Sequence, residues 1–201
     1  MGGARGRYNG GMPGTALLVM DVQNGIVARV PDAAESLLAT LVRATTAARG
    51  RGIPVIYVRV AFRPGAADIS PHNKAFAAIA TSAPLLLDDP ATQIHSDVAP
   101  VDQDVVVVKK RVSAFTGSDL EVVLRSLDVS SLVLTGIATS GVVLSTLRQA
   151  ADLDFRLTVL ADGCADADPE VHRLLLEKVF PRQAAVVTTE EWVRGLDGPP
   201  G

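Results

Sequence analysis

Cysteine and aromatic residues are scarce in this sequence of 201 residues, and their scarcity excludes several classes of protein. The single cysteine, Cys164, rules out an internal disulfide and any zinc site built from several thiolates, and it fits a reducing compartment. Aromatic residues make up only 4% of a chain that is 48% hydrophobic, so Val, Leu and Ala must form the core. This composition favours layered strands and helices over an aromatic-rich β-sandwich.

The sequence also lacks an excess of positive charge and any long apolar run. Its 19 Lys and Arg residues face 22 Asp and Glu residues, and the pI is about 5.6, which disfavours nucleic-acid binding. No apolar stretch approaches the roughly 20 residues needed to cross a bilayer. The glycine-rich start lacks the apolar segment of a signal peptide. We therefore expect a cytoplasmic protein with no nucleic-acid partner and no membrane insertion.

The chain length fits one globular domain, which we expect over residues 15–194, between a disordered tail at 1–14 and a flexible tail at 195–201. Six short, continuously apolar runs predict strands at 16–20, 55–60, 105–108, 132–135, 157–160 and 185–187. Because strands of this kind have both faces buried, helices should cover both sides of the sheet. The prediction is an α/β fold: a three-layer αβα sandwich, Rossmann-like, with an open, six-stranded, mainly parallel sheet.

Helical spacing of apolar residues predicts helices at 32–49, 139–153 and 169–179, the last one capped by Asp168. Ser118 and Glu121 have the spacing of a capping box and predict a further helix from that point. Residues 61–103 are irregular and rich in proline, and a crossover of this length is expected to border a functional site.

Polar residues follow three of the predicted strands, at the edge where open parallel sheets place their functional groups. Asp21 follows the first strand, Lys109 ends the third, and a turn from Gly136 to Gly141 follows the fourth. A carboxylate and an ammonium at neighbouring strand ends could form a partly buried pair that moves protons. Taken singly, each has a plainer interpretation as a turn former, a solvated charge or a tight strand-to-helix turn.

In this order the segments resemble the isochorismatase-like cysteine hydrolase superfamily, over roughly residues 15–190. The matching phrases are Asp21-x-Gln23, Lys109 followed by Ser113-Ala114-Phe115, Gly136-Ile137-Ala138-Thr139, Phe62-Arg63-Pro64-Gly65, and Asp162 with Pro169-Glu170-x-His172. Each phrase is weak alone, but five in the right order form a specific signal.

The resemblance implies a small-molecule hydrolase with Asp21 and Lys109 as catalytic residues. The substrate-binding residues that it implies are Gln23, Arg63, Phe115, Ile137, Ala138, Gly141 and Val142. It also implies a cis peptide near Ile137 and Ala138, backbone N–H groups that orient the substrate, and a homodimer or homotetramer. We expect no cofactor and no metal, because the three histidines lack the spacing of a zinc site.

One departure from the family pattern changes the expected chemistry. Most members carry a nucleophilic cysteine three residues after the threonine of Gly-x-x-Thr, and here that residue is Val142. Members without the cysteine cleave a vinyl ether by protonation and water addition. The leading hypothesis is therefore Asp/Lys acid–base hydrolysis of an enol ether such as isochorismate, or of a small amide.

The alternative is a catalytically degenerate member that binds a metabolite or a protein partner. A third, weaker hypothesis places the nucleophile at Ser140 or Cys164, although a buried inert thiol is the expected role of Cys164. The protonation state of Asp21 stays open at this point, because a nearby ammonium lowers a carboxyl pKa and burial raises it.

Overall fold

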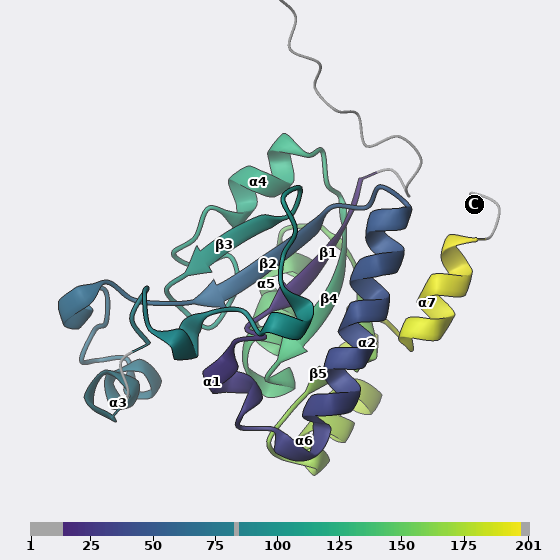
Figure 1. Cartoon of the computed structure of the whole chain (residues 1–201). Coiled ribbons are helices and arrows are strands. Elements are labelled where there is room, and N and C mark those ends of the chain that lie inside the picture. The colour runs from purple at the N-terminus through teal and green to yellow at the C-terminus, as the bar shows by residue number, and fades with distance from the viewer. Residues whose placement is uncertain (1–13, 83–84, 198–201) are drawn as a thin grey trace, which may run out of the picture.

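The computed structural model describes residues 14–82 and 85–197 and arranges them in three layers (Figure 1). A parallel sheet of six strands forms the middle layer, in the order β3-β2-β1-β4-β5-β6. The strands are β1 (Thr15–Met20), β2 (Val55–Val60), β3 (Val105–Lys109), β4 (Ser131–Ile137), β5 (Arg156–Ala165) and β6 (Ala185–Val187). The predicted α/β fold is confirmed. The predicted N-terminal tail lies outside the described residues except for Gly14, and residues 198–201 of the C-terminal tail also lie outside them.

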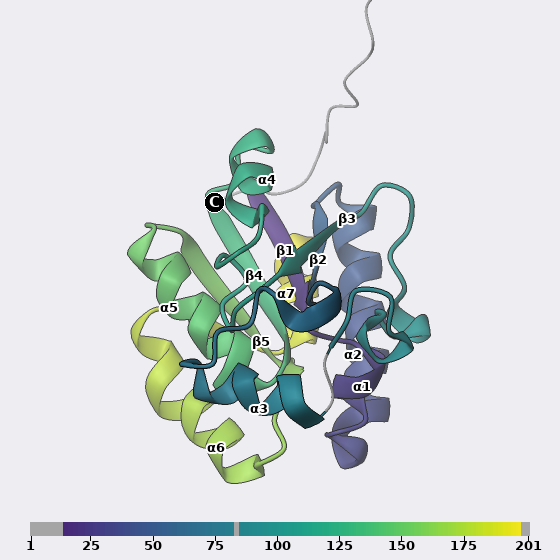
Figure 2. The same ribbon diagram turned by 90° about the vertical axis from the view of Figure 1, so that its left-hand side faces the viewer.

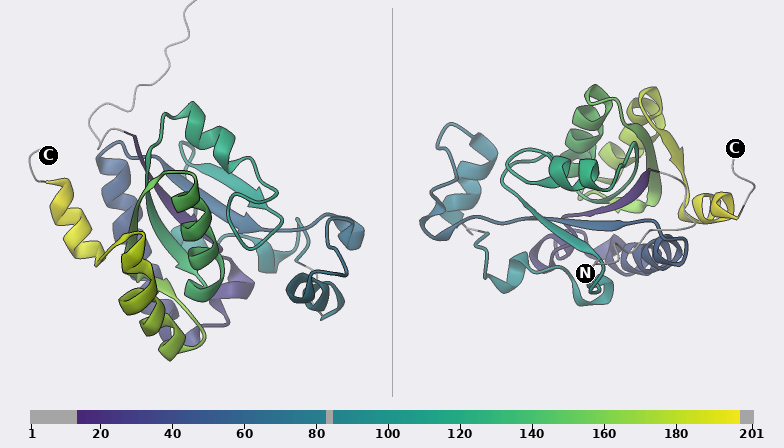
Figure 3. Two further views of the ribbon diagram at one scale, coloured as in Figure 1. Left: turned by 180° about the vertical axis from the view of Figure 1, so that it is seen from behind. Right: turned by 90° about the horizontal axis from the view of Figure 1, so that it is seen from above.

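Helices cover both faces of the sheet, as Figure 3 shows in the view from above, with α2 on one side and α5 and α6 on the other. The helices are α1 (Asn24–Val27), α2 (Pro31–Gly50), α3 (Lys74–Ser82), α4 (Leu120–Ser126), α5 (Leu144–Asp152), α6 (Pro169–Leu174) and α7 (Thr189–Leu196). Within the described ranges, none of these helices combines the length and apolarity that crossing a bilayer requires.

The central strand β1 is buried along its whole length and divides the core in two. Leu18 and Met20 point into the apolar cluster beneath α4 and α5, whereas Leu17 and Val19 point into the cluster beneath α2 and α7. This division follows from the alternation of side chains along a strand. Because both faces of β1 are covered by the core, all of its residues must be compatible with burial, and an uninterrupted apolar run meets this requirement.

The strand order reverses between β1 and β4, which run side by side in the same direction. In open α/β sheets the crevice beyond the carboxyl ends of two such strands is the usual ligand site. Asp21 follows β1 at this point and the turn beginning at Ala138 follows β4, so the topology brings them to the same edge.

The crossover between β2 and β3 contains short 3₁₀ turns and one helix that the sequence analysis did not predict, α3. This helix stands off from the sheet beyond the end of β2 (Figures 1 and 2). Phe76 of α3 packs edge-on against Phe62, with ring centroids 5.4 Å apart, and Leu85 closes this small apolar cluster. The helix thus depends on its own cluster rather than on the main core.

Two predicted element boundaries need correction around β5 and α5. Strand β5 continues to Ala165, so Cys164 lies inside the strand, paired with Gly136, and not in a loop beyond it. The register between β4 and β5 shifts after Leu134, and this irregularity lets β5 extend past the apolar run that was used to predict it. Helix α5 begins at Leu144, because residues Thr139–Val143 form a π-helical turn.

The capping box predicted at the start of α4 does not form. The Ser118 hydroxyl donates to the carbonyl of Ala114 at 2.6 Å, and Glu121 forms an ion pair with Arg125 one turn later. A capping box forms instead at α7, which the sequence analysis did not predict, between Thr188 and Glu191. Helix α7 extends to Leu196 and so includes the first two residues of the expected C-terminal tail, 195 and 196.

The close pairing of β1 and β4 predicts that Gly136 tolerates no side chain. Its φ is 141°, and a Cβ atom would lie 2.2 Å from the carbonyl oxygen of Met20. We expect Gly136→Ala to lower the free energy of unfolding by at least about 3 kcal/mol in urea titration, because β1 and β4 must separate to make room. The matched control is Gly195→Ala in α7, where nothing lies within 4 Å of the added atom. Equal stability of the two variants would contradict this account.

Candidate active site

A buried ion pair joins two of the predicted strand ends. The Lys109 Nζ lies 2.7 Å from Asp21 Oδ2, and both side chains are almost completely buried. Lys109 ends β3 and reaches past the end of β2 to the residue after β1. Its ammonium also donates to the carbonyl of Val112 at 2.7 Å, and this second contact helps to fix its position. The two residues that were predicted to be catalytic are therefore in direct contact.

The backbone at Asp21 breaks away from the strand to present its carboxylate. Its φ is 57°, in the left-handed region that aspartate tolerates better than most residues. Its N–H still donates to the carbonyl of Val58 at 2.7 Å, which ties the turn to β2. The carboxylate thus leaves the sheet without losing its anchor to the backbone of the neighbouring strand.

The environment of Asp21 makes its carboxyl group easier to protonate than an ordinary aspartate. Burial raises its pKa from 3.8 to about 6, although the charge and hydrogen bond of Lys109 act in the opposite direction. Oδ1 is buried and has no hydrogen-bond partner in the part of the chain that the structure describes. Of the two opposing effects left open by the sequence, burial therefore outweighs the ammonium. Oδ1 is the oxygen that is free to carry the proton.

The side chain of Gln23, which was expected to bind the substrate, forms hydrogen bonds with the protein backbone. Its side-chain amide donates to the carbonyls of Val60 and Thr92, at 3.0 and 2.7 Å, and its oxygen accepts the N–H of Val60 at 2.8 Å. Gln23 is fully buried, and both ends of its amide are engaged. It joins the end of β2 to the crossover and fixes the segment that follows Asp21.

The turn after β4 contains a cis peptide bond between Ile137 and Ala138, as the family resemblance implied. The carbonyl of Ala138 accepts the N–H of Gly141 at 3.0 Å, and the N–H of Ser140 donates to the Asp166 carboxylate at 2.7 Å. These two N–H groups, which lie in the turn whose backbone is expected to orient a substrate, donate hydrogen bonds within the protein. The turn is held by its own hydrogen bonds and by the loop after β5.

A hydrogen bond that the sequence analysis missed anchors the same turn to α6. The hydroxyl of Thr139 lies 2.8 Å from Nδ1 of His172, and Thr139 is fully buried. Partial burial lowers the pKa of His172, an effect that the nearby Asp166 carboxylate opposes. The Pro169-Glu170-x-His172 motif predicted that this histidine lies in the first turns of the helix, which is confirmed. The motif did not predict its hydrogen bond with Thr139.

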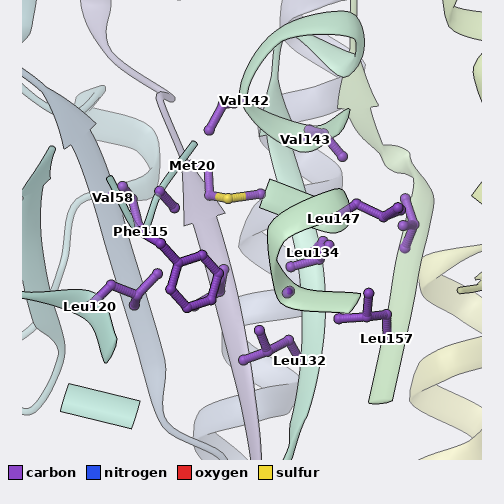
Figure 4. Close-up of a cluster of buried hydrophobic side chains, with 14 of the residues drawn as sticks. Met20, Val58, Phe115, Leu120, Leu132, Leu134, Val142, Val143, Leu147 and Leu157 are labelled. Carbon is purple, nitrogen blue, oxygen red and sulfur yellow. The ribbon is translucent and has the colours of Figure 1, made fainter. Parts of the chain in front are cut away.

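Val142 lies on the same face of the sheet as the side chains of Leu18 and Met20 in β1 and Val107 in β3. It is 2% exposed and belongs to the same apolar cluster as Met20 and Val107, the residues that precede Asp21 and Lys109 on that face. Figure 4 shows Val142 above Met20 in this cluster. The turn after β4 therefore presents an apolar, branched side chain toward the end of β1.

Three other predicted substrate-binding residues lie in different surroundings. Phe115 is buried in the core against Phe155, with ring centroids 6.1 Å apart, and Ile137 is buried in the cluster beneath α2. Arg63 has a mostly exposed side chain that forms an ion pair with Asp68 at 3.1 Å. No role for these three residues in holding a substrate follows from these contacts.

The candidate nucleophile Cys164 lies in an environment that suppresses thiol reactivity. The residue is buried, and burial raises the pKa of its thiol to about 12. A thiol with this pKa is almost entirely protonated near neutral pH, whereas the thiolate is the reactive form. Within the described residues, no group of three or more His, Cys, Asp or Glu side chains is arranged to hold a metal ion.

Comparisons with known proteins agree with this architecture. Residues 15–191 match the isochorismatase domain family. An uncharacterized isochorismatase family protein of Escherichia coli O157:H7, YecD, is 33% identical over 184 residues, covering 90% of this chain and 96% of that protein. The ureidoacrylate amidohydrolase RutB of Pseudomonas syringae pv. syringae is 32% identical over 207 residues, covering 91% of this chain and 81% of that one. The solved structure of an isochorismatase family protein from Burkholderia thailandensis superposes with a TM-score of 0.81 at 30% identity, covering 92% and 97% of the two chains.

The electrostatics of the pair predict how Asp21 titrates. We expect its carboxyl carbon, followed by ¹³C NMR, to titrate with a pKa near 6. Lys109→Met should raise that pKa further, because the opposing charge and hydrogen bond are lost. Since the folded pKa exceeds the unfolded value, this group favours folding most below pH 4 and loses that contribution as the pH rises to about 6. Asp21→Asn should remove this part of the pH dependence of stability.

The neighbouring lysine supplies the control for this titration. Lys110→Met removes an ammonium from the same segment without touching the pair, and the pKa of Asp21 should stay near its wild-type value. A wild-type pKa near 3.8 would show that burial does not dominate at this carboxyl group. A lower pKa in Lys109→Met would show that Lys109 does not oppose burial.

Proposed function

The chain belongs to the isochorismatase family, and from this premise we propose that it hydrolyses a small molecule by acid–base chemistry of Asp21 and Lys109, without a cysteine nucleophile. The observation that carries the proposal is the buried ion pair with one unbonded carboxylate oxygen. Asp21 is the proton carrier in this mechanism, and Lys109 sets its charge state and polarises the substrate.

A purely structural role explains this pair poorly. Burying two charges costs several kcal/mol per ion, and well-packed apolar residues of similar volume are often at least as stabilising. A structural pair would also be expected to satisfy its oxygens, yet Asp21 Oδ1 has no partner among the described residues. Carboxyl groups with a raised pKa next to a specific charge partner are concentrated at catalytic sites. These features support a catalytic role.

The chemistry that suits this arrangement is protonation of an enol ether. In the proposed reaction, Oδ1 of Asp21 gives its proton to the terminal vinyl carbon, and the electron pair of the double bond forms the new C–H bond. Water adds to the resulting oxocarbenium carbon, and its released proton restores the acid form of Asp21. The hemiketal then collapses to an alcohol and a ketone. A carboxyl pKa of about 6 leaves a usable fraction of the acid near neutral pH.

We assign Val142 to the position that the nucleophilic cysteine occupies in most of the family. Its side chain offers no nucleophile, and it packs in the cluster that ends at Met20, beside Asp21. Cys164 does not replace the nucleophile, because its thiol is buried with a raised pKa. Ser140 does not replace it in this proposal either, because His172 is engaged with Thr139 and the Asp166 carboxylate accepts the backbone N–H of Ser140.

Small amides are the second substrate class, supported by the similarity to a ureidoacrylate amidohydrolase. In an amide reaction Asp21 would act on a water molecule rather than on a carbon atom. A degenerate family member that binds a metabolite or a protein partner is the alternative function, supported by the absence of a nucleophile at Val142. We further propose that the protein works in the cytoplasm as a homodimer or homotetramer, as the family resemblance implies.

Turnover of a substrate panel tests the proposal directly. The panel contains isochorismate, aryl vinyl ethers and small amides, each measured with wild type and with Asp21→Asn and Lys109→Met. We expect each variant to lower kcat/KM by at least about 100-fold, because loss of a general acid or its partner has effects of that order. The double variant should lose little more than either single variant, because the two residues act as one unit.

The matched control is Arg125→Gln, which removes an exposed cation paired with Glu121 on the surface of α4. Its turnover should equal that of wild type. Additive losses in the double variant would mean that Asp21 and Lys109 act separately. No turnover of any panel member, with a panel member bound at a defined stoichiometry, would favour the alternative of a binding protein.

Restoring a thiol tests the assignment of Val142. Valine and cysteine are similar in size, so Val142→Cys should fold normally, and the new thiol should become acidic beside Lys109 with Asp21 as its base. In a Val142→Cys, Cys164→Ser protein, the rate of alkylation against pH should inflect below the roughly 8.5 of a free cysteine. The wild-type protein, whose only thiol is Cys164, should react slowly under native conditions. An unshifted inflection, or no reaction, would overturn the assignment.

A further inference from the structure

A cavity of about 400 Å³ lies between the crossover and the loop that follows Lys109. Residues 67–70 form one wall, and Lys110, Arg111, Thr116 and Gly117 form the other. Gly117 is required for this shape: its φ is 73°, and a Cβ atom would lie 2.8 Å from the Cβ of Lys110. The chain thus places two consecutive cations against a cavity of the size that small ligands occupy.

The charges around this cavity do not balance. Asp68 is the only acidic residue among those that line the cavity. Its carboxylate accepts a hydrogen bond from the Arg63 guanidinium at 3.1 Å and lies 3.5 Å from Lys110 Nζ. Partial burial alone would raise the pKa of Asp68, but hydrogen bonds from its own N–H and that of Arg63, together with the Lys110 ammonium, hold it below its usual value. Asp68 is therefore an anion already shared by two cations.

Arg111 is left without an anion. Its Nη1 donates to the carbonyls of Asp68 and Lys110, at 2.9 and 2.6 Å, and the side chain is half-buried. Across residues 14–82 and 85–197 it forms no ion pair, and its Nε and Nη2 have no hydrogen-bond acceptor. A guanidinium that is partly withdrawn from water normally has a carboxylate or phosphate partner. Its position is fixed by the two carbonyls, while its remaining donors stay available.

The segment that carries these cations is tied to the Asp21–Lys109 pair. Lys109 donates to the carbonyl of Val112, so Lys110 and Arg111 lie within the loop that this hydrogen bond closes. Lys110 in turn donates to the carbonyl of Ala61, at the end of β2. An anion bound by this loop would therefore be held by the same segment that fixes the catalytic ammonium.

We propose that this cavity binds a carboxylate group of the substrate, with Arg111 as its main partner and Lys110 as a second cation. Recognition of a substrate rests on the proposed function, whereas binding of a carboxylate does not. A free anion that binds here without being part of the substrate has the same chemistry, and the experiments below separate the two sources.

Malonate serves as the probe for carboxylate binding, with sodium chloride at equal ionic strength as the reference. We expect malonate to raise the Tm saturably and to bind by calorimetry. Arg111→Gln should weaken this affinity by roughly tenfold to hundredfold, because charge-assisted hydrogen bonds are lost. Arg111→Lys should restore part of it, and Arg125→Gln, which lies on α4, should leave it unchanged.

A second variant guards against a simple folding defect in Arg111→Gln. Ser70→Asp keeps Arg111 and adds a carboxylate to the cavity wall, so it should abolish malonate binding without loss of stability. The proposal is overturned if malonate and chloride have equal effects, or if Arg111→Gln and Ser70→Asp bind malonate as wild type does.

Kinetics then distinguish a substrate carboxylate from a free anion. For substrates that are turned over, malonate should inhibit competitively, and Arg111→Gln should raise KM about tenfold for a carboxylate-bearing substrate but not for its neutral amide analogue. Malonate binding with no effect on KM would make this a free-anion site and would overturn the assignment to the substrate. Malonate binding in a protein without turnover would uphold the anion site while the hydrolase proposal fails.

Discussion

The buried contact between Asp21 and Lys109 is the constraint around which the carboxyl edge of the sheet is built. Two charges in a dry site are tolerated only when their geometry is fixed, because each loses its hydration. The fold meets this condition with backbone groups: the Asp21 N–H is bound to Val58, and the Lys109 ammonium to the carbonyl of Val112. The parallel sheet itself supplies the convergence, since β1 and β3 end at the same edge.

The residues around the pair serve mainly to hold it in place. Gln23 uses both ends of its amide to join β2 to the crossover, and Thr139 with His172 joins the turn after β4 to α6. A catalytic group must be held within about 0.5 Å of its productive position, which a loop alone does not achieve. Strand ends therefore carry the proposed acid–base pair, which the crossover and the loop after β3 help to hold in place.

Sequence alone could predict the features that local pattern determines. The apolar runs predicted all six strands, and the positions of Asp21 and Lys109 after two of them predicted the ion pair, because parallel strands end together. Contacts between distant segments were not predictable. The role of Gln23 depends on the carbonyl of Thr92, and the extension of β5 depends on a shifted register with β4. Arg111 has the sequence pattern of a solvated charge, and only its position in the cavity distinguishes it from one.

The proposed replacement of a nucleophilic cysteine by Val142 would change what is required of Asp21. A cysteine needs its neighbouring carboxylate as a base, and so needs that group ionised at working pH. An enol ether needs the same carboxyl group as an acid, and so needs it protonated. In the proposed mechanism, the Val142 side chain, in the same cluster as Met20, helps to exclude water from this region, and desolvation is the effect that raises the pKa of Asp21. In the proposed mechanism, valine therefore does more than remove a nucleophile, since it favours the protonation state that the remaining pair requires.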